Sequence, residues 1–176
     1  MLMLLIRFKT TLYTIGSWTI LRLPKSASAK LPSRGQVMVQ GIINETVFQL
    51  PLEPDGKLSH WCKIDQALGK AAKVKAGDTV AVVMEPTTNW PEPKVPADIQ
   101  RAVTATPQLK ALWMDITPMA RWDWLRWIGS TKNLETHKRR IEVACSKLKA
   151  GERRPCCFNR NMCCEPAVSH NGVLLP

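Results

Sequence analysis

Four cysteines toward the end of the sequence are the residues whose type and spacing most directly suggest chemistry. They form the pattern CC-x5-CC and are Cys156, Cys157, Cys163 and Cys164. Four thiolates this close together can bind one tetrahedral zinc ion or another soft metal, although the C-x2-C pairs of zinc knuckles are missing. Neighbouring arginines would lower a thiol pKa and favour a redox-sensing cysteine. The sequence leaves these two hypotheses open beside a third, a reduced tail without a chemical role.

A second group of candidate residues is basic. Between residues 138 and 160 there are eight Lys and Arg against two Glu, so +6 of the net charge of +11 lies in this segment. A cationic surface can bind phosphate or another anion. The alternative is a solvated helix face whose cations stabilise the helix C-terminus. The residues that we expect to contact an anion or a partner are Lys138, Arg139, Arg140, Lys147, Arg153, Arg154 and Arg160.

Catalytic motifs are absent from the sequence. No nucleophile elbow, phosphate loop, paired-carboxylate motif or H-E-x-x-H sequence occurs. His60 and Cys62 lie two residues apart in a predicted strand, without a third group to orient them. His137 lies one helical turn from Leu134 and Ile141, which predicts a histidine packed on the apolar side of its helix. We expect a protein that is not an enzyme and has no cofactor, unless zinc or another soft metal binds the cysteines.

The first half of the chain is predicted to form short strands. Alternation of apolar and polar residues marks segments 8–12, 18–23, 37–41, 47–52, 60–64 and 79–85. Asp65 can cap a short helix over residues 66–72. Asn44-Glu45 lies where a tight hairpin would turn, although Glu is a poor residue for a positive φ. Residues 53–56, Glu-Pro-Asp-Gly, are typical of a turn. Short strands with frequent turns indicate a small β-barrel, which we place at residues 1–85.

The second half is predicted to be helical. Residues 86–95 are rich in proline, which is typical of a stiff linker. Helices are expected to start at Val95-Pro96, Thr106-Pro107 and Thr117-Pro118, and a last helix is expected from a cap at Ser130 or Thr131 to residue 150. Apolar spacing predicts that Trp113 and Trp122 are core residues and that Trp124 and Trp127 lie on another flank of their helix, and we expect core or domain contact for all four. We place a helical domain of about four helices at residues 96–151 and an irregular tail rich in Cys and Arg at residues 152–176.

Several fragments of the second half resemble one family. They are Ile116-Thr117-Pro118, Arg121-Trp122-Asp123-Trp124, Trp127-Ile128, Lys132 with Glu135-Thr136, and Arg139-Arg140-Ile141-Glu142. They are similar to the bacteriocin-protection, YdeI/OmpD-associated (OmdA-like) family. The first half, with Phe8, Leu23-Pro24, Phe48 and residues 75–80, resembles a bacterial domain of unknown function that commonly precedes that family. Two positions depart from the pattern: Glu45 replaces an expected glycine, and His137 replaces an expected arginine.

The resemblance implies an α+β protein. Its first domain would be a double-split β-barrel, distantly like the AbrB/MazE transcription-factor fold, and its second domain would be small and helical. The family is associated with resistance to antimicrobial peptides and with an outer-membrane porin partner. It has no agreed catalytic residues, so the resemblance assigns none here.

Composition limits the function classes further. The chain has 176 residues, of which 45% are hydrophobic and 22% are charged, and this excludes a disordered protein. No apolar run approaches the roughly 20 residues of a membrane span. The N-terminal segment lacks the features of a signal peptide, so we expect a cytoplasmic protein with reduced cysteines.

Three functional hypotheses follow from these observations. The first is a monomeric, non-enzymatic stress or bacteriocin-protection protein that binds an unidentified protein or anionic partner. The alternatives are a nucleic-acid-binding regulator that uses an AbrB-like barrel and a basic helix, and a thiol or metal protein that uses the CC-x5-CC segment.

Overall fold

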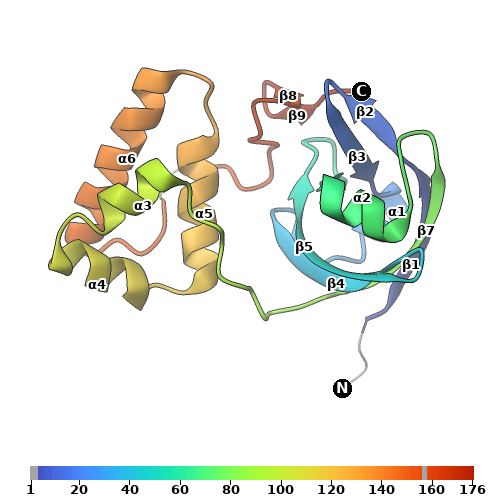
Figure 1. The fold of residues 1–176 in the computed structure, drawn as a ribbon, viewed down its shortest axis with the longest axis horizontal. Helices are drawn as coiled ribbons and strands as arrows, with labels where there is room; N and C mark the ends of the chain where they lie inside the picture. The colour runs from blue at the N-terminus through green and yellow to red at the C-terminus, as the bar shows by residue number, and fades with distance from the viewer. Residues whose placement is uncertain (1–3, 156–157) are drawn as a thin grey trace. The chain divides into compact units, whose positions relative to one another are not determined.

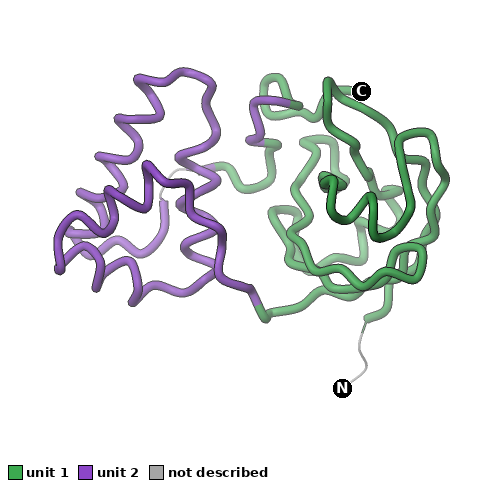
Figure 2. The backbone as a smooth tube through the Cα atoms, in the orientation of Figure 1, with its two compact units in different colours: residues 1–89, 159–163, 168–176 green, residues 90–158, 164–167 purple. Residues whose placement is uncertain are grey.

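A computed structural model describes residues 4–155 and 158–176. The chain divides into two compact units, which are shown in different colours in Figure 2. The first unit contains residues 1–89, 159–163 and 168–176, and the second contains residues 90–158 and 164–167. The described residues form six helices (Figure 1). None of these helices is both long enough and apolar enough to cross a membrane.

The first unit is built on one antiparallel sheet of seven strands. Its order is β1-β7-β4-β5-β6-β3-β2, and the sheet curls on itself into a half-barrel (Figure 1). The Thr10 hydroxyl on β1 donates to the Arg22 carbonyl on β3 at 2.8 Å, although these strands are not neighbours in the sheet order. The expected small β-barrel is confirmed in this form. The strands are β1 (Ile6–Thr11), β2 (Tyr13–Ile15), β3 (Trp18–Arg22), β4 (Val37–Ile43), β5 (Thr46–Pro54), β6 (His60–Ile64) and β7 (Thr79–Pro86).

Two short helices accompany this sheet. α2 (Gln66–Ala72) begins as predicted, because the Asp65 carboxylate accepts a hydrogen bond from the Leu68 amide at 2.8 Å. α1 (Lys25–Ser28) was not predicted and lies in a stretch that looks like a polar connection. It follows Pro24 and buries Ala27 and Ser28. Four residues are too few for a helical apolar period to be visible in the sequence.

The hairpin between β4 and β5 turns at Asn44-Glu45. Ile43 pairs directly with Thr46, and both central residues have positive φ angles, 45° and 66°. This is the tight two-residue turn that the sequence predicts, with Glu45 in the strained position. The Asn44 side-chain amide donates to the Ala72 carbonyl at 2.5 Å, and the Thr46 hydroxyl donates to the Ala71 carbonyl at 3.1 Å. These bonds connect the turn to the C-terminal end of α2.

Four helices are formed by the described residues of the second unit, which is the number expected for the helical domain. They are α3 (Ala97–Val103), α4 (Pro107–Asp115), α5 (Pro118–Gly129) and α6 (Leu134–Lys149). Thr106 and Thr117 cap α4 and α5 as predicted. The cap of α6 is Asn133, whose side chain accepts from the Thr136 amide at 2.9 Å, so the expected cap at Ser130 or Thr131 is wrong.

The core of the second unit confirms that Trp113 and Trp124 are buried, and it corrects the assignment of Trp122. Trp124 has no exposed surface and lies in the core with Trp113 and Ile128. Trp122, expected in the core, is half-buried, and its indole N–H donates to the Pro91 carbonyl at 2.9 Å. The apolar spacing misplaced the buried face of α5 because Arg121 and Asp123 are themselves buried there.

The segment expected as an irregular tail contains a short hairpin, β8 (Ser169–His170) with β9 (Val173–Leu174). Residues 159–163 and 168–176 belong to the first unit. Cys163, Val168 and Leu174 form a cluster there with Ile20 and Trp61. The end of the described chain therefore contributes core residues to the unit with which the chain begins.

Candidate functional site

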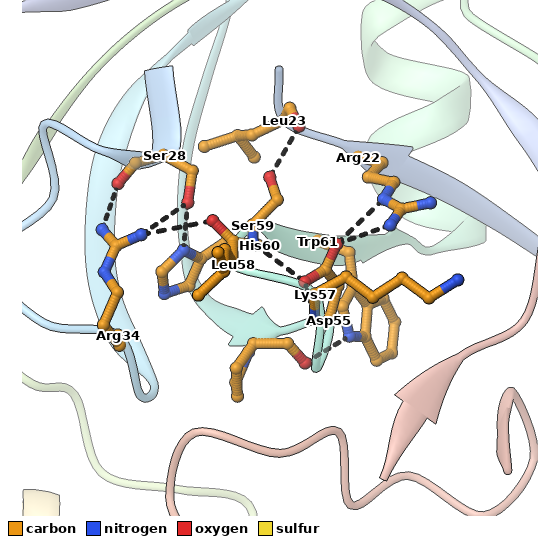
Figure 3. A network of polar contacts seen from close by, with 11 residues as sticks. Arg22, Leu23, Ser28, Arg34, Asp55, Lys57, Leu58, Ser59, His60 and Trp61 are labelled. Atoms are coloured by element: carbon orange, nitrogen blue, oxygen red, sulfur yellow. Dashed lines mark hydrogen bonds and ion pairs between the residues drawn. The ribbon is translucent and has the colours of Figure 1, made fainter. Parts of the chain in front are cut away.

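A buried carboxylate organises the turn between β5 and β6 (Figure 3). Asp55 has no exposed surface, and its Oδ1 accepts hydrogen bonds from the amides of Lys57 at 2.7 Å and Ser59 at 2.8 Å. Its Oδ2 accepts from Arg22 Nη2 at 2.6 Å. Burial alone would raise the pKa of Asp55, but the amide bonds and the Arg22 charge together hold this pKa below its usual value. Asp55 is therefore a charged group that holds the turn.

A histidine and a serine lie beside this turn in the same network (Figure 3). His60 Nε2 is 2.8 Å from the Gly35 carbonyl, which can only accept, so Nε2 carries the proton. His60 Nδ1 must then accept from the Ser28 hydroxyl at 2.7 Å. Arg34 in turn donates to Ser28. Burial lowers the pKa of His60, and although the Gly35 bond opposes this shift, the nearby Arg34 charge adds to it. The ring is therefore neutral at pH 7.

The Ser28–His60 pair has the geometry of a nucleophile with its base, but both side chains are completely buried. No substrate can reach the Ser28 hydroxyl without unfolding of the surrounding chain. Cys62, two residues from His60, is also buried, and burial raises the pKa of its thiol to about 12. A thiol with this pKa is protonated at neutral pH and is a poor nucleophile. The contacts in Figure 3 join Ser28 of α1 and Arg34 to His60 of β6, and the Gly35 carbonyl holds the other side of the His60 ring.

The predicted metal ligands lie only partly within the described residues. Cys156 and Cys157 lie outside them. Cys163 is buried in the first unit, and Cys164 is half-buried and belongs to the second unit. Within residues 4–155 and 158–176, no group of three or more His, Cys, Asp and Glu is placed to hold a metal. The four-cysteine site stays a prediction.

Most of the predicted anion-binding residues contact groups of the protein itself. Arg140 donates to the Trp127 carbonyl at 2.8 Å, and its guanidinium lies 5.5 Å from the centre of the Trp127 ring. Ion pairs join Lys147 to Glu152 at 3.2 Å, Arg153 to Asp115 at 2.8 Å and Arg154 to Asp123 at 3.8 Å. Arg160 lies in the first unit, where its backbone packs against Gly35. These contacts stabilise the fold and reduce the charge available to a ligand.

Lys138 and Arg139 are different, because both are exposed on α6. The Lys138 ammonium is 3.8 Å from the Glu135 carboxylate, and both side chains are open to water. Together with Glu142 they line a shallow hollow on the outer side of the helix. One turn before Lys138 lies Leu134, which is 75% exposed, although the sequence predicted it to be apolar core. We call these residues, Leu134, Glu135, Lys138, Arg139 and Glu142, the α6 face.

The second unit also contains buried charge that the sequence analysis missed. Arg121 is only 4% exposed and forms a two-pronged ion pair with Glu92, with Nε 3.0 Å from Oε2. Its Nη1 donates to the carbonyls of Trp113, at 3.0 Å, and Ile116. Arg121 therefore caps the C-terminal end of α4 and holds the proline-rich segment at Glu92 against α5. His137, expected to be packed among apolar residues, instead pairs with Asp98 at 2.8 Å, and this bond lowers the pKa of Asp98.

A cluster of lysines on the first unit was also missed. We call it the lysine surface, and it consists of five exposed residues, Lys9, Lys63, Lys70, Lys73 and Lys75. They line two shallow hollows that share Val74. Among the described residues, no carboxylate forms an ion pair with any of these lysines. They are scattered over 67 positions of the sequence, so only the fold brings them together.

Family models match parts of both units. Residues 92–151, which include all of α3 to α6, match the family described as Bacteriocin-protection, YdeI or OmpD-Associated (OmdA). Residues 5–84 match a domain of unknown function, DUF1905. The family and the preceding domain suggested by the sequence are thus confirmed, in the expected order. No curated protein matches the chain.

Proposed function

Because residues 92–151 are an OmdA (YdeI/OmpD-associated) domain and residues 5–84 are a DUF1905 domain before it, we propose that this protein acts in protection against bacteriocins by binding a partner protein. The family description supports the protective role. A binding role rather than a catalytic one is supported by the closed Ser28–His60 pair, which no substrate can reach.

The observation that carries the proposal is the composition of the α6 face. Most other predicted contact residues of the second unit already form internal ion pairs or hydrogen bonds. The α6 face keeps two cations, two carboxylates and an exposed leucine within one arc of the helix. Charges of both signs around an apolar side chain are complementary to the surface of a folded protein, which also carries both signs. A site for an anion alone would contain only the cations and not the two carboxylates.

The experiment that tests this proposal is a protection assay in a bacteriocin-sensitive bacterial host that produces the full chain. We expect Lys138→Glu combined with Arg139→Glu to abolish protection, because charge reversal repels a complementary partner. The matched control is Lys94→Glu with Arg101→Glu, which reverses two exposed cations elsewhere in the second unit. Circular dichroism should show the same fold for all three proteins.

Two outcomes would contradict the proposal. If the wild-type chain gives no protection, the protective role is wrong. If both double variants protect as well as the wild-type chain, or lose protection equally, the α6 face is not the contact surface.

A further inference from the structure

The lysine surface gathers charge from four separate parts of the first unit. Lys9 lies on the exposed side of β1, opposite Ala81 of β7, and Lys63 lies on β6 between the buried residues Cys62 and Ile64. Lys70 lies in α2, and Lys73 and Lys75 follow that helix. The first hollow contains Lys63, Lys70 and Lys75, and the second contains Lys9 and Lys73. The two hollows adjoin at Val74, which lines both of them.

The carboxylates within these hollows are already occupied by backbone amides. Asp65 accepts from the Leu68 amide at 2.8 Å, and Asp78 accepts from the Lys75 amide at 2.9 Å. No further carboxylate lines either hollow, so five lysines against two aspartates leave a net charge of +3. Two of the five lysines, Lys70 and Lys73, lie near the C-terminus of α2, where a cation interacts favourably with the helix dipole. Lys9, Lys63 and Lys75 have no structural role of this kind.

One of these cations is held in position by an aromatic ring. The Lys63 ammonium lies 4.1 Å from the centre of the Trp18 ring. Ser17 and Thr19, on either side of Trp18, line the same hollow and can donate hydrogen bonds from their hydroxyls. Hydroxyl and ammonium donors side by side are the groups that proteins use to contact phosphate oxygens.

We infer that the lysine surface is a binding site for the phosphate backbone of a nucleic acid. Several like charges in adjoining hollows fit a ligand that carries several phosphates in a row. The hollows offer no exposed large apolar side chain for insertion into a bilayer, because Ile64, Val74 and Val80 are buried or half-buried. Lysines carry compact charges without the rigid fork that reads a base edge, so binding should depend little on sequence. This site is separate from the α6 face and independent of the proposed function.

The binding experiment uses the full chain and fluorescently labelled random-sequence oligonucleotides of about 20 nucleotides, single-stranded and duplex. Fluorescence anisotropy gives the dissociation constant as a function of salt concentration. If about three to five phosphates are neutralised, log K for the duplex should fall with log salt with a slope of about −3 to −4.5. The triple variant Lys63→Gln, Lys70→Gln, Lys75→Gln should bind at least about tenfold more weakly and have a shallower slope.

The matched control removes the same charge from elsewhere on the first unit. Lys25→Gln, Lys30→Gln, Lys57→Gln replaces three exposed lysines outside the two hollows, and its affinity should stay within about threefold of the wild-type value. All substituted side chains are exposed, so each triple variant should fold. Equal loss in both variants would overturn the inference, because binding would then follow net charge alone.

Two further results would also overturn it. One is the absence of binding to either oligonucleotide at low salt. The other is tighter binding to vesicles that contain anionic phospholipid than to the oligonucleotides, which would identify a membrane surface as the ligand. Loss of binding only in the Lys63, Lys70, Lys75 variant would support it.

Discussion

Residues 1–89 of the first unit and residues 90–151 of the second unit carry the same net charge and use it differently. Residues 1–89 contain 11 Lys and Arg against 6 Asp and Glu, and residues 90–151 contain 11 against 6 as well. In the second range, arginines such as Arg121 and Arg140 bind carbonyls, carboxylates and an aromatic ring within the unit. In the first range, five lysines line open hollows without ion pairs among the described residues. The density of charge in a sequence therefore does not locate a binding surface, because the available internal partners decide which charges stay exposed.

The largest expected effect comes from Arg121, the most deeply buried cation of the second unit. Arg121→Met removes the hydrogen bonds to Trp113 and Ile116 and leaves buried carbonyls at the end of α4 without a donor. We expect a loss of about 3 kcal/mol in the free energy of unfolding, measured by calorimetry or urea denaturation. The Glu92 side chain is 63% exposed, so Glu92→Gln should cost less than about 1 kcal/mol. Equal losses in the two variants would show that the ion pair, rather than the capping of α4, stabilises the unit.

A smaller effect is expected from pH in the first unit. Since burial lowers the folded-state pKa of His60, this side chain takes up a proton near its ordinary pKa of 6.5 in the unfolded chain and only at lower pH in the folded chain. The contribution of neutral His60 to the free energy of unfolding should therefore be fully present above pH 6.5. It should fall as the pH drops from 6.5 toward the folded-state pKa, by up to about 1.4 kcal/mol per pH unit.

This pH effect is measured as the change in melting temperature between pH 7.5 and 5. His60→Gln cannot titrate and should flatten the profile over this window. An unchanged slope in that variant would assign the pH dependence to other groups. Asp55, whose folded-state pKa is lowered, contributes its full stabilisation above its ordinary pKa of 3.8 and loses this contribution as the pH falls through its folded-state pKa.

The smallest effects on stability are expected from replacing one partly buried arginine of the second unit and one exposed lysine of the first. These two variants test the contrast between the units directly. Arg140→Gln removes the hydrogen bond to Trp127 and the contact with its ring, so we expect a loss of about 1 kcal/mol. Lys70→Gln removes an exposed charge without an ion pair and should change the free energy of unfolding by less than about 0.5 kcal/mol. Both are measured by urea denaturation. If Lys70→Gln is the more destabilising change, the lysine surface has a structural role and the contrast between the units is wrong.

Local patterns predicted much of the fold. Alternating apolar residues located six of the seven strands of the main sheet, and a capping residue before proline located the starts of α4 and α5. The four-residue helix α1 and the two-residue strands β8 and β9 are too short to leave a period. The buried face of α5 was misplaced because ion pairing makes Arg121 as buried as an apolar residue.

The candidate surfaces were predictable only in part. Lys138 and Arg139 stand in a dense basic run of the sequence, which was enough to name them as candidate contact residues. The carboxylates that pair with Lys147, Arg153 and Arg154 follow from tertiary packing, which no local pattern contains. The lysine surface depends on the register between β1 and β7 and on the placement of α2, so its residues have no sequence signature.

The return of residues 159–163 and 168–176 to the first unit has a consequence for biosynthesis. During translation the seven main strands leave the ribosome first, yet Trp61 and Ile20 must wait for Cys163, Val168 and Leu174 to complete their cluster. The core residues of the second unit, up to Leu148, are all synthesised before those three. The unit that begins the chain is therefore the last to be completed, and a nascent chain stalled near residue 158 would present Trp61 to chaperones.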